Sequence, residues 1–261
     1  MALFLASSLC GTASAETIKI GGTGAALGTM RLLADAYAAE HAEPTIVVLP
    51  SLGTNGGIKA LLAGAIEIAL ALRPLNDAEA SGAGASIEYA RTPFVFATAI
   101  GNPAQTITTA ELVDIYLGKQ VDWPDGSKIR LVIRPTGDND SDMVRSLSPE
   151  MRAAELHAEQ RKGLLFAVTD TEAADNLERV PGSLGTSTLA LIASEKRALK
   201  ALTLNGVVPS AAALADGSYP LGKSFYMLLG SAPSPAVQGF VDFVRSPTGR
   251  AILTRTAHLA P

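Results

Sequence analysis

Short apolar runs alternate along the chain with longer segments in which apolar residues recur every three or four positions. The first pattern is typical of buried strands and the second of amphipathic helices. The predicted strands cover residues 17–20, 45–49, 66–70, 89–100, 129–133, 166–168 and 225–229. The predicted helices cover residues 28–40, 55–63, 109–117, 149–161, 172–178 and 235–245, with a short terminal helix after 246. This alternation predicts an α/β protein whose mostly parallel sheets are covered by helices.

Local signals mark the ends of two of these helices. Thr108 and Glu111 form a capping box before helix 109–117, and Gly118 follows its last turn. Pro149 stands at the first position of the helix after Ser148, where proline is favoured.

Two lobes are expected, because 261 residues exceed the comfortable length of one doubly wound domain. No stretch has the composition of a linker, so we expect extended strands to cross between the lobes. The candidate crossing strands are residues 94–100 and 222–229.

The first fifteen residues have the features of the end of a secretory signal peptide. They carry no charge, contain an apolar run and end in Ala13-Ser14-Ala15. A buried N-terminal helix is the alternative interpretation. Cys10 is the one cysteine, and Leu9 before it fits poorly with a lipidation site. Cleavage after Ala15 would give a cysteine-free periplasmic protein with neither a disulfide nor a thiolate metal site.

The overall charge limits the classes of partner. A net charge of −4 argues against nucleic acid or an anionic membrane surface. The three histidines are scattered, without the spacing of metal ligands. Beyond the leader, no apolar run approaches the roughly 18 residues of a membrane-spanning helix. We therefore expect a soluble monomer that has no cofactor, no bound metal and no segment inserted in a membrane.

Two glycine-rich turns in succession connect a predicted strand to a predicted helix. Such turns leave free N–H groups at the helix start, where the helix dipole also favours an anion. Two arginines, Arg73 and Arg134, follow two other predicted strands, and guanidinium groups suit oxyanions. All four points lie at the carboxyl ends of strands, where open α/β sheets bind ligands. The candidate ligand-binding residues in the turns are Thr23, Gly24 and Ala25, and then Ser51, Gly53, Thr54, Asn55 and Gly56. Close helix packing by the glycines and surface ion pairs of the arginines are the alternative interpretations.

Four stretches resemble the periplasmic phosphate-binding proteins of ABC transporters. They are GTGAALGTM (22–30), PSLGTNGGIKAL (50–61), IALALRPL (68–75) and ITTAELVDIYLGK (107–119), the last with WPDG (123–126) downstream. Weaker similarities are PGSLG (181–185), SYPL (218–221) and FVDFVRSPTGR (240–250). The resemblance covers nearly the whole chain after the leader, in the family's order.

The resemblance implies a two-lobed type II binding-protein fold, each lobe a mostly parallel sheet flanked by helices, with two crossover strands as the hinge. It implies a first lobe of residues 16–96 plus 223–261 and a second of 97–222. It further implies that the cleft between them holds the ligand and closes by hinge motion, that an inner-membrane ABC permease is the partner, and that no reaction is catalysed.

The third loop departs from the family pattern. Leu72 precedes Arg73, where the family has Ser or Asp, and residues 137–141 read GDNDS instead of a Gly-Ser-Gly-Thr clamp. We expect Asp138, Asp140 and Ser141 to contact the ligand from the second lobe, with an Asp accepting the proton of hydrogen phosphate. Asp140 could instead cap the next helix. The acidic run 169–172 could line the cleft or cap the helix that follows it.

Several other functions compete with phosphate binding. Residues 138–142 copy the start of a calcium loop, but a methionine replaces its glycine and the twelfth-position Glu is missing. The glycines at 22, 24 and 28 miss the spacing of a dinucleotide-binding motif. Ser51 lacks a nucleophile elbow. A binding protein of the same fold for an organic anion or a cation, serving uptake or sensing, stays open. The expected function is periplasmic binding of phosphate or a related oxyanion.

Overall fold

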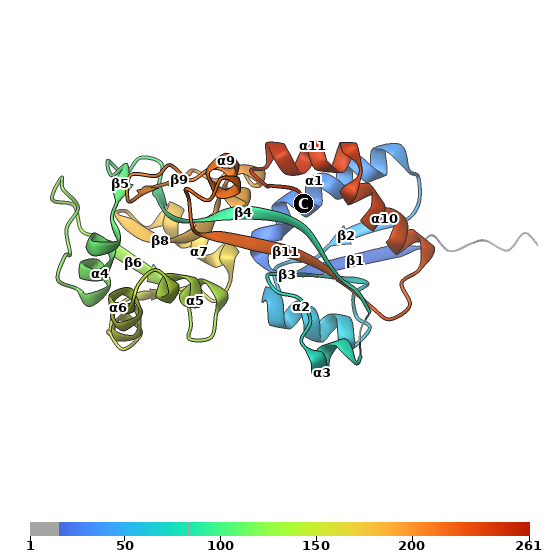
Figure 1. Ribbon diagram of the computed structural model, residues 1–261, viewed down its shortest axis with the longest axis horizontal. Helices are drawn as coiled ribbons and strands as arrows, with labels where there is room; N and C mark the ends of the chain where they lie inside the picture. Colours follow the sequence, from blue (N-terminus) through green and yellow to red (C-terminus); the bar gives the residue numbers. More distant parts are fainter. Residues whose placement is uncertain (1–15, 83) are drawn as a thin grey trace, which may run out of the picture.

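The computed structural model describes residues 16–82 and 84–261. The molecule is elongated, and two strands run along its middle from one end toward the other (Figure 1). The expected signal peptide and Cys10 lie outside the described residues, so both stay predictions. Within the described part of the chain, no helix has the length and apolar character needed to cross a bilayer.

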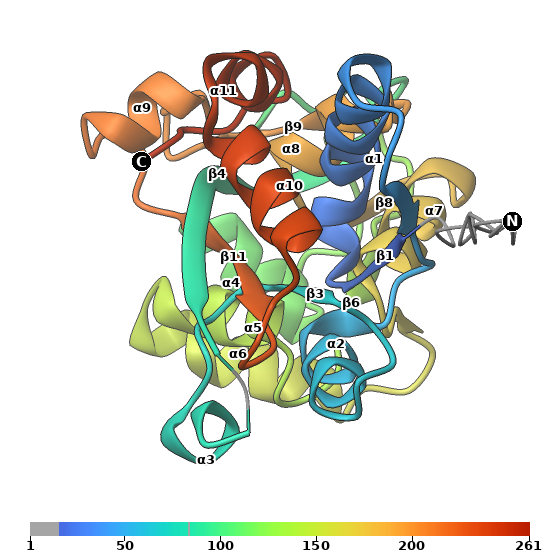
Figure 2. The ribbon, with the colours of Figure 1, turned by 90° about the vertical axis from the view of Figure 1, so that its right-hand side faces the viewer.

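One end of the molecule, here called the first region, contains residues 16–90 and 225–261. Its strands β1 (Thr17–Gly22), β2 (Thr45–Val48) and β3 (Ile68–Ala71) are parallel, with β1 between the other two. Helices α1 (Gly24–Glu40), α10 (Pro235–Arg245) and α11 (Pro247–Arg255) lie on one face, and α2 (Gly53–Leu62) and the short α3 (Asp77–Ala80) lie toward the other (Figure 2).

The other end, here called the second region, contains residues 94–221. Strand β6 (Arg130–Ile133) is parallel to β7 (Leu165–Phe166) on one side and to β8 (Ser183–Thr188) on the other. Its helices are α4 (Thr109–Leu117), α5 (Asn139–Ser146), α6 (Pro149–Glu159), α7 (Asp170–Arg179), α8 (Leu189–Ser194) and α9 (Ala211–Ala215). Strands β5 (Thr106–Ile107) and β10 (Thr203–Leu204) pair with each other, and β9 (Leu199–Ala201) pairs with β4.

Two antiparallel strands, β4 (Ser86–Ala99) and β11 (Gly222–Leu229), join the regions. The first part of β4 pairs with β11, and its second part pairs with β8 and β9. Strand β11 pairs with β3 on its other side, so a single sheet has the order β2-β1-β3-β11-β4-β8-β6-β7. The predicted type II α/β fold with two crossover strands is confirmed. Parallel pairing holds within β1–β3 and within β6–β8.

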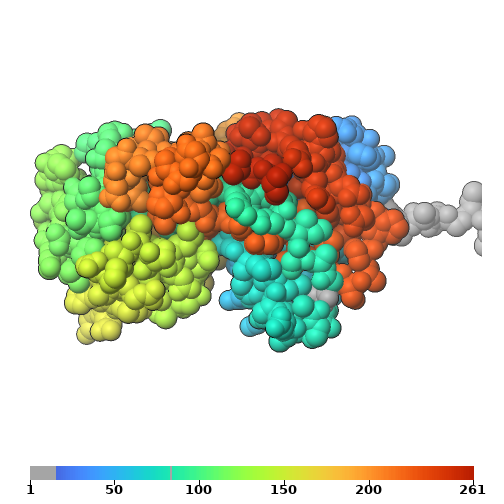
Figure 3. Space-filling model, in the orientation of Figure 1, coloured from blue at the N-terminus to red at the C-terminus, as the bar shows by residue number. Residues whose placement is uncertain are grey.

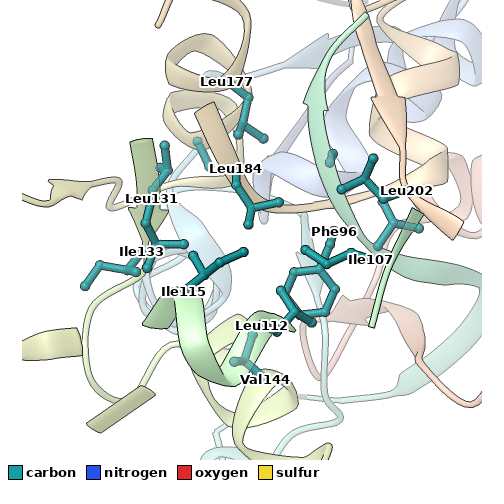
Figure 4. Close-up of a cluster of buried hydrophobic side chains, with 14 of the residues drawn as sticks. Phe96, Ile107, Leu112, Ile115, Leu131, Ile133, Val144, Leu177, Leu184 and Leu202 are labelled. Atoms are coloured by element: carbon teal, nitrogen blue, oxygen red, sulfur yellow. The ribbon is translucent and has the colours of Figure 1, made fainter. Parts of the chain in front are cut away.

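Each region has its own hydrophobic cluster. In the second region, Phe96, Leu112, Ile115 and Leu184 pack between the sheet and its helices (Figure 4). In the first region, side chains of β1 and β3 pack with those of α1, α10 and α11, and a smaller cluster lies under α2. Separate cores favour two bodies joined by two strands, as a hinge requires. The exact lobe boundaries stay a prediction.

Candidate functional site

A cavity of about 420 Å³ lies between the two regions. Figure 3 shows the surface hollowed between the cyan segment that contains α2 and the olive segment that contains α5. The first region contributes Thr23, Leu52, Gly53, Thr54, Asn55, Gly56, Leu72 and Arg73 to the lining. The second region contributes Arg134, Gly137, Asp138, Asn139, Asp140, Asp142, Val168 and Asp170.

The amino terminus of α2 forms one wall of the cavity. Leu52 is its N-cap residue, and this side chain makes no capping hydrogen bond within the described chain. Gly53 turns the backbone into the helix with φ 67°. A Cβ at Gly57 would lie 2.7 Å from the Cα of Gly22, so glycine there lets α2 pack closely against the end of β1. The uncapped first turn therefore presents its N–H groups and the positive end of the helix dipole to the cavity.

Arg73 lies beside this helix terminus. Its guanidinium donates to both carboxylate oxygens of Glu79, at 2.7 and 2.9 Å, and to Oδ1 of Asn55 at 3.1 Å. The hydrogen bonds from Arg73 and from the Asn76 backbone lower the pKa of Glu79 to about 2. The Arg73 side chain is 38% exposed. Glu79 thus orients Arg73, whose side chain stays partly exposed and lines the cavity.

Arg134 lies opposite, at the end of β6, and is buried. It donates to both oxygens of Asp138, at 3.2 and 2.9 Å, and to the carbonyl of Ala167 at 3.0 Å. Burial opposes its charge, but Asp170, Asp140 and Asp138 outweigh that effect and raise the pKa of Arg134. The guanidinium is therefore a permanently charged part of the cavity wall.

Asp138 and Asp140 both line the cavity and also make hydrogen bonds within the protein. Asp138 is the N-cap of α5, because its side chain accepts the N–H of Asp140 at 2.9 Å. The alternative in which Asp140 caps this helix is wrong. Asp140 is buried and accepts hydrogen bonds from Lys223 and, at 2.7 Å, from the hydroxyl of Thr186. Because residues 138–142 form a helix start, they do not have the form of a calcium loop.

Asp170 connects the two regions across the cavity. Its carboxylate accepts the Thr23 hydroxyl at 2.9 Å and the Ala25 N–H at 3.2 Å. Asp170 begins α7 in the second region, whereas Thr23 and Ala25 begin α1 in the first. Burial alone would raise the pKa of Asp170, but Lys223, Arg134 and these hydrogen bonds lower it. An ionised carboxylate therefore occupies the amino terminus of α1.

The two interpretations of the acidic run 169–172 are both correct. Thr169 caps α7 by accepting the N–H of Glu172 at 3.1 Å. The next residue, Asp170, lines the cavity.

Nine of the thirteen predicted ligand-binding residues line this cavity. They are Thr23, Gly53, Thr54, Asn55, Gly56, Arg73, Arg134, Asp138 and Asp140. The remaining four, Gly24, Ala25, Ser51 and Ser141, are not among its lining residues. Contact of any of the thirteen with a ligand stays a prediction.

For each of these four residues, the local structure explains why it does not line the cavity. Asp170 covers the amide of Ala25, and a Cβ at Gly24 would lie 3.2 Å from the Asp170 Cβ. Ser51 is packed beside Gly24, and its hydroxyl finds no partner among the described residues. The Ser141 hydroxyl turns inward to the carbonyls of Arg134 and Pro135, at 3.1 and 3.2 Å.

Lys223 was missed by the sequence analysis. It stands on β11 with its ammonium against Asp140, 4.0 Å from Asp170 and 4.9 Å from the centre of the Phe94 ring. A lysine within an apolar strand carries no local signal of such a role. Among the described residues, no group of three or more His, Cys, Asp or Glu is arranged to hold a metal ion.

Comparison with known proteins decides the family. The model of the PBP superfamily domain matches residues 10–248. The chain belongs to the PBP superfamily. It is therefore a solute-binding protein from a family of binding proteins rather than of enzymes. No curated protein matched the sequence significantly.

Several solved structures of binding proteins have the same fold. A putative phosphate ABC transporter substrate-binding protein with bound phosphate from Clostridium perfringens matches with a TM-score of 0.78 and 19% identity, over 94% of this chain and all of the other. An ABC-type phosphate transport receptor from Vibrio cholerae matches with a TM-score of 0.64 and 20% identity, over the same shares. The Azotobacter vinelandii periplasmic molybdate-binding protein matches with a TM-score of 0.64 and 15% identity, over 94% of this chain and 99% of the other.

Proposed function

We propose that this PBP-superfamily protein binds phosphate or a related oxyanion in the cavity between its two regions and delivers it to an inner-membrane ABC permease. In this proposal the protein is periplasmic, residues 16–96 plus 223–261 and residues 97–222 act as the two lobes, and β4 and β11 act as the hinge. Cleft closure would bring the ligand into contact with both lobes.

One observation carries the proposal. Arg73 from the first region and Arg134 from the second line the same cavity as the uncapped amino terminus of α2. A guanidinium and a helix terminus each favour an anion, for independent reasons. Each charge-assisted hydrogen bond contributes about 1.5–3 kcal/mol. Four such bonds, less the cost of association, bring a micromolar ligand within reach with a few further contacts.

The named ligands of the structural neighbours support an oxyanion. The Clostridium perfringens structure contains phosphate, and the Azotobacter vinelandii protein is named for molybdate. At identities below 25% these proteins share the fold with this chain, and the ligand comes to this chain as part of the proposal.

A direct binding experiment tests the proposal. The chain from residue 16 onward would be purified, unfolded and refolded to remove bound ligand, and titrated calorimetrically with phosphate, sulfate and molybdate. We expect saturable heat with phosphate at micromolar concentration, about −8 kcal/mol of binding free energy. Binding of another solute with no heat from any of the three oxyanions would refute the proposal.

An organic anion is a second candidate, favoured by the size of the cavity. A volume of about 420 Å³ lies in the range of sites for organic ligands, roughly 300–1,000 Å³. One structural neighbour, PEB3, is described with bound L-phospholactate and matches with a TM-score of 0.62 and 12% identity. Titration with phosphorylated and carboxylated three-carbon acids beside inorganic phosphate distinguishes the two candidates.

A further inference from the structure

The amino termini of α1 and α2 both point at the gap between the regions, but only one of them is open to it. Residues 53–56 at the start of α2 line the cavity, and Leu52 leaves that terminus without a side-chain cap in the described structure. At the start of α1, Asp170 accepts the hydroxyl of Thr23 and the N–H of Ala25. A helix terminus binds oxyanions through just such donors. The Asp170 carboxylate thus occupies the position in which α1 would hold an anionic ligand.

Asp170 is held in that position from several sides. Its side chain is 10% exposed, and Lys223 lies 4.0 Å away. Gly24 gives it room, because a Cβ there would approach the Asp170 Cβ to 3.2 Å. The contact joins residues 147 positions apart in the chain and belonging to different regions. It is therefore a contact across the cleft and not a local helix cap.

The charges around the cavity, including that of Asp170, affect which anions the cavity can bind. Four cations, Arg73, Arg134, Arg145 and Lys223, line the cavity or contact its lining. Six carboxylates do the same, namely Glu79, Asp138, Asp140, Asp142, Asp170 and Glu172. The fixed charge is therefore net negative before any ligand enters. A multiply charged anion is repelled more strongly by such a site than a singly charged one.

We propose that Asp170 is the specificity-determining residue of this cavity: its carboxylate acts as a built-in anion at the amino terminus of α1 and confines the negative group of the ligand to the α2 side. The ligand is then a molecule with one singly charged oxyanion group, which Arg73, Arg134 and the first turn of α2 receive. Divalent oxyanions are excluded, because one helix terminus is already filled and its occupant adds negative charge.

The ligand class rests on the proposed function, whereas the occupation of α1 by Asp170 does not. The experiment separates the two. Sodium sulfate, a divalent probe, and sodium formate, a probe that resembles the missing side chain, are titrated into the wild type, Asp170→Ala and Asp170→Asn. Chloride salts hold the ionic strength constant. Glu172→Gln is the matched control, because it removes a carboxylate from the same turn of α7 without touching α1; that side chain accepts the N–H of Val168.

Asp170→Ala empties the terminus of α1. We expect it to bind sulfate about tenfold more tightly than the wild type or more, the ratio that one charge-assisted hydrogen bond contributes. We also expect formate to raise its melting temperature and to leave those of the wild type and Glu172→Gln unchanged. Asp170→Asn keeps the size and loses the charge, so we expect a smaller gain for sulfate and none for formate.

Equal sulfate affinity in the wild type and Asp170→Ala would overturn the inference, as would an equal gain in Glu172→Gln. If Asp170→Ala does not fold, the test rests on Asp170→Asn. Sulfate affinity in Asp170→Asn equal to that of the wild type would then overturn the inference. Phosphate is titrated in parallel. A wild type that binds no oxyanion, together with a sulfate-binding Asp170→Ala, would refute the proposed function and leave the role of Asp170 standing.

Discussion

The ammonium of Lys223 on β11 forms a buried ion pair with Asp140 on α5, 83 residues away in the sequence. Both residues are 2% exposed. One partner stands on a strand that joins the regions, and the other stands in the first turn of a helix beside the cavity. The pair therefore links one of the two connecting strands to the wall of the candidate site.

Replacement of Lys223 is expected to destabilise the protein strongly. Lys223→Met leaves Asp140 buried without its cation, and breaking a buried pair on one side costs about 3–5 kcal/mol. Urea denaturation measures the loss. Lys128→Met is the matched control, because its pair with Asp122 is on the surface and such pairs contribute at most about 1 kcal/mol. Equal losses of stability in the two variants would show that the buried pair contributes no more to stability than the surface pair.

Replacement of Arg73 tests whether the cavity is the oxyanion-binding site. Arg73→Ala removes a partly exposed guanidinium, so we expect oxyanion affinity to fall by a factor of about 10–100, the contribution of one charge-assisted hydrogen bond. Calorimetric titration measures the fall. Arg91→Ala removes an arginine that is paired with Glu88 and is not among the residues lining the cavity, and should leave affinity unchanged. Unchanged affinity in Arg73→Ala would remove Arg73 from the site.

Arg134→Ala is a less selective variant than Arg73→Ala. Arg134 is buried, and its removal would leave Asp138 without its main partner and the Ala167 carbonyl without a donor. We expect a loss of stability of about 1–3 kcal/mol or more together with the loss of binding. Chemical denaturation run beside the titration separates the two effects.

The close approach of α2 to β1 predicts opposite outcomes for one substitution at two helical glycines. Gly57→Ala places a methyl group 2.7 Å from the Gly22 Cα, so we expect destabilisation of about 1–3 kcal/mol and weaker ligand binding as α2 shifts. Gly239→Ala in α10 meets only the Tyr37 hydroxyl, at 3.5 Å, and should stabilise by about 0.5–1 kcal/mol through helix propensity. Thermal unfolding of both variants checks the signs. Stabilisation by Gly57→Ala would contradict the tight packing.

His258 is expected to make the protein less stable at acid pH. Burial lowers the pKa of its imidazole from 6.5 to about 4. Between these values the unfolded chain binds a proton that the folded chain does not, so stability falls as pH falls from 6.5 toward 4. The loss is about 3 kcal/mol at most, from the shift in pKa. His258→Leu should remove this dependence in denaturation curves measured at pH 7 and pH 4.5. An unchanged pH dependence in the variant would assign the effect to other groups.

Local signals explain why some elements were predicted with correct boundaries. Helix 109–117 was predicted from Thr108, Glu111 and Gly118. In the structure Thr108 and Glu111 form the capping box, and Gly118 ends the helix with φ 74°. Helix 235–245 was predicted because its apolar residues recur with helical spacing after the capping Ser234. Each of these signals lies within a few residues of the element that it marks, so the sequence alone displays it.

Strand β8 shows where the hydrophobic pattern fails. Its sequence SLGTST is poor in apolar residues, yet all six positions are buried. Three of its four hydroxyl groups have partners inside the protein: Ser183 donates to the Leu177 carbonyl at 2.7 Å, Thr186 donates to Asp140 at 2.7 Å, and Thr188 accepts the N–H of Leu191 at 3.1 Å. The Ser187 hydroxyl has no partner among the described residues. Burial of polar side chains depends on partners that the tertiary structure supplies, so no local pattern predicts it. Helix α5 was missed for a related reason, because its first turns carry mainly polar residues.

The sequence by itself determined the α/β class, the strand ends that carry Arg73 and Arg134, and the glycine-rich start of α2, because all of these are written in neighbouring residues. Only the tertiary structure decided that Asp170 fills the amino terminus of α1 and that Lys223 pairs with Asp140. These contacts join residues 147 and 83 positions apart. Which groups form an ion pair depends on their distance in space and on their burial. The order of residues along the chain gives neither quantity.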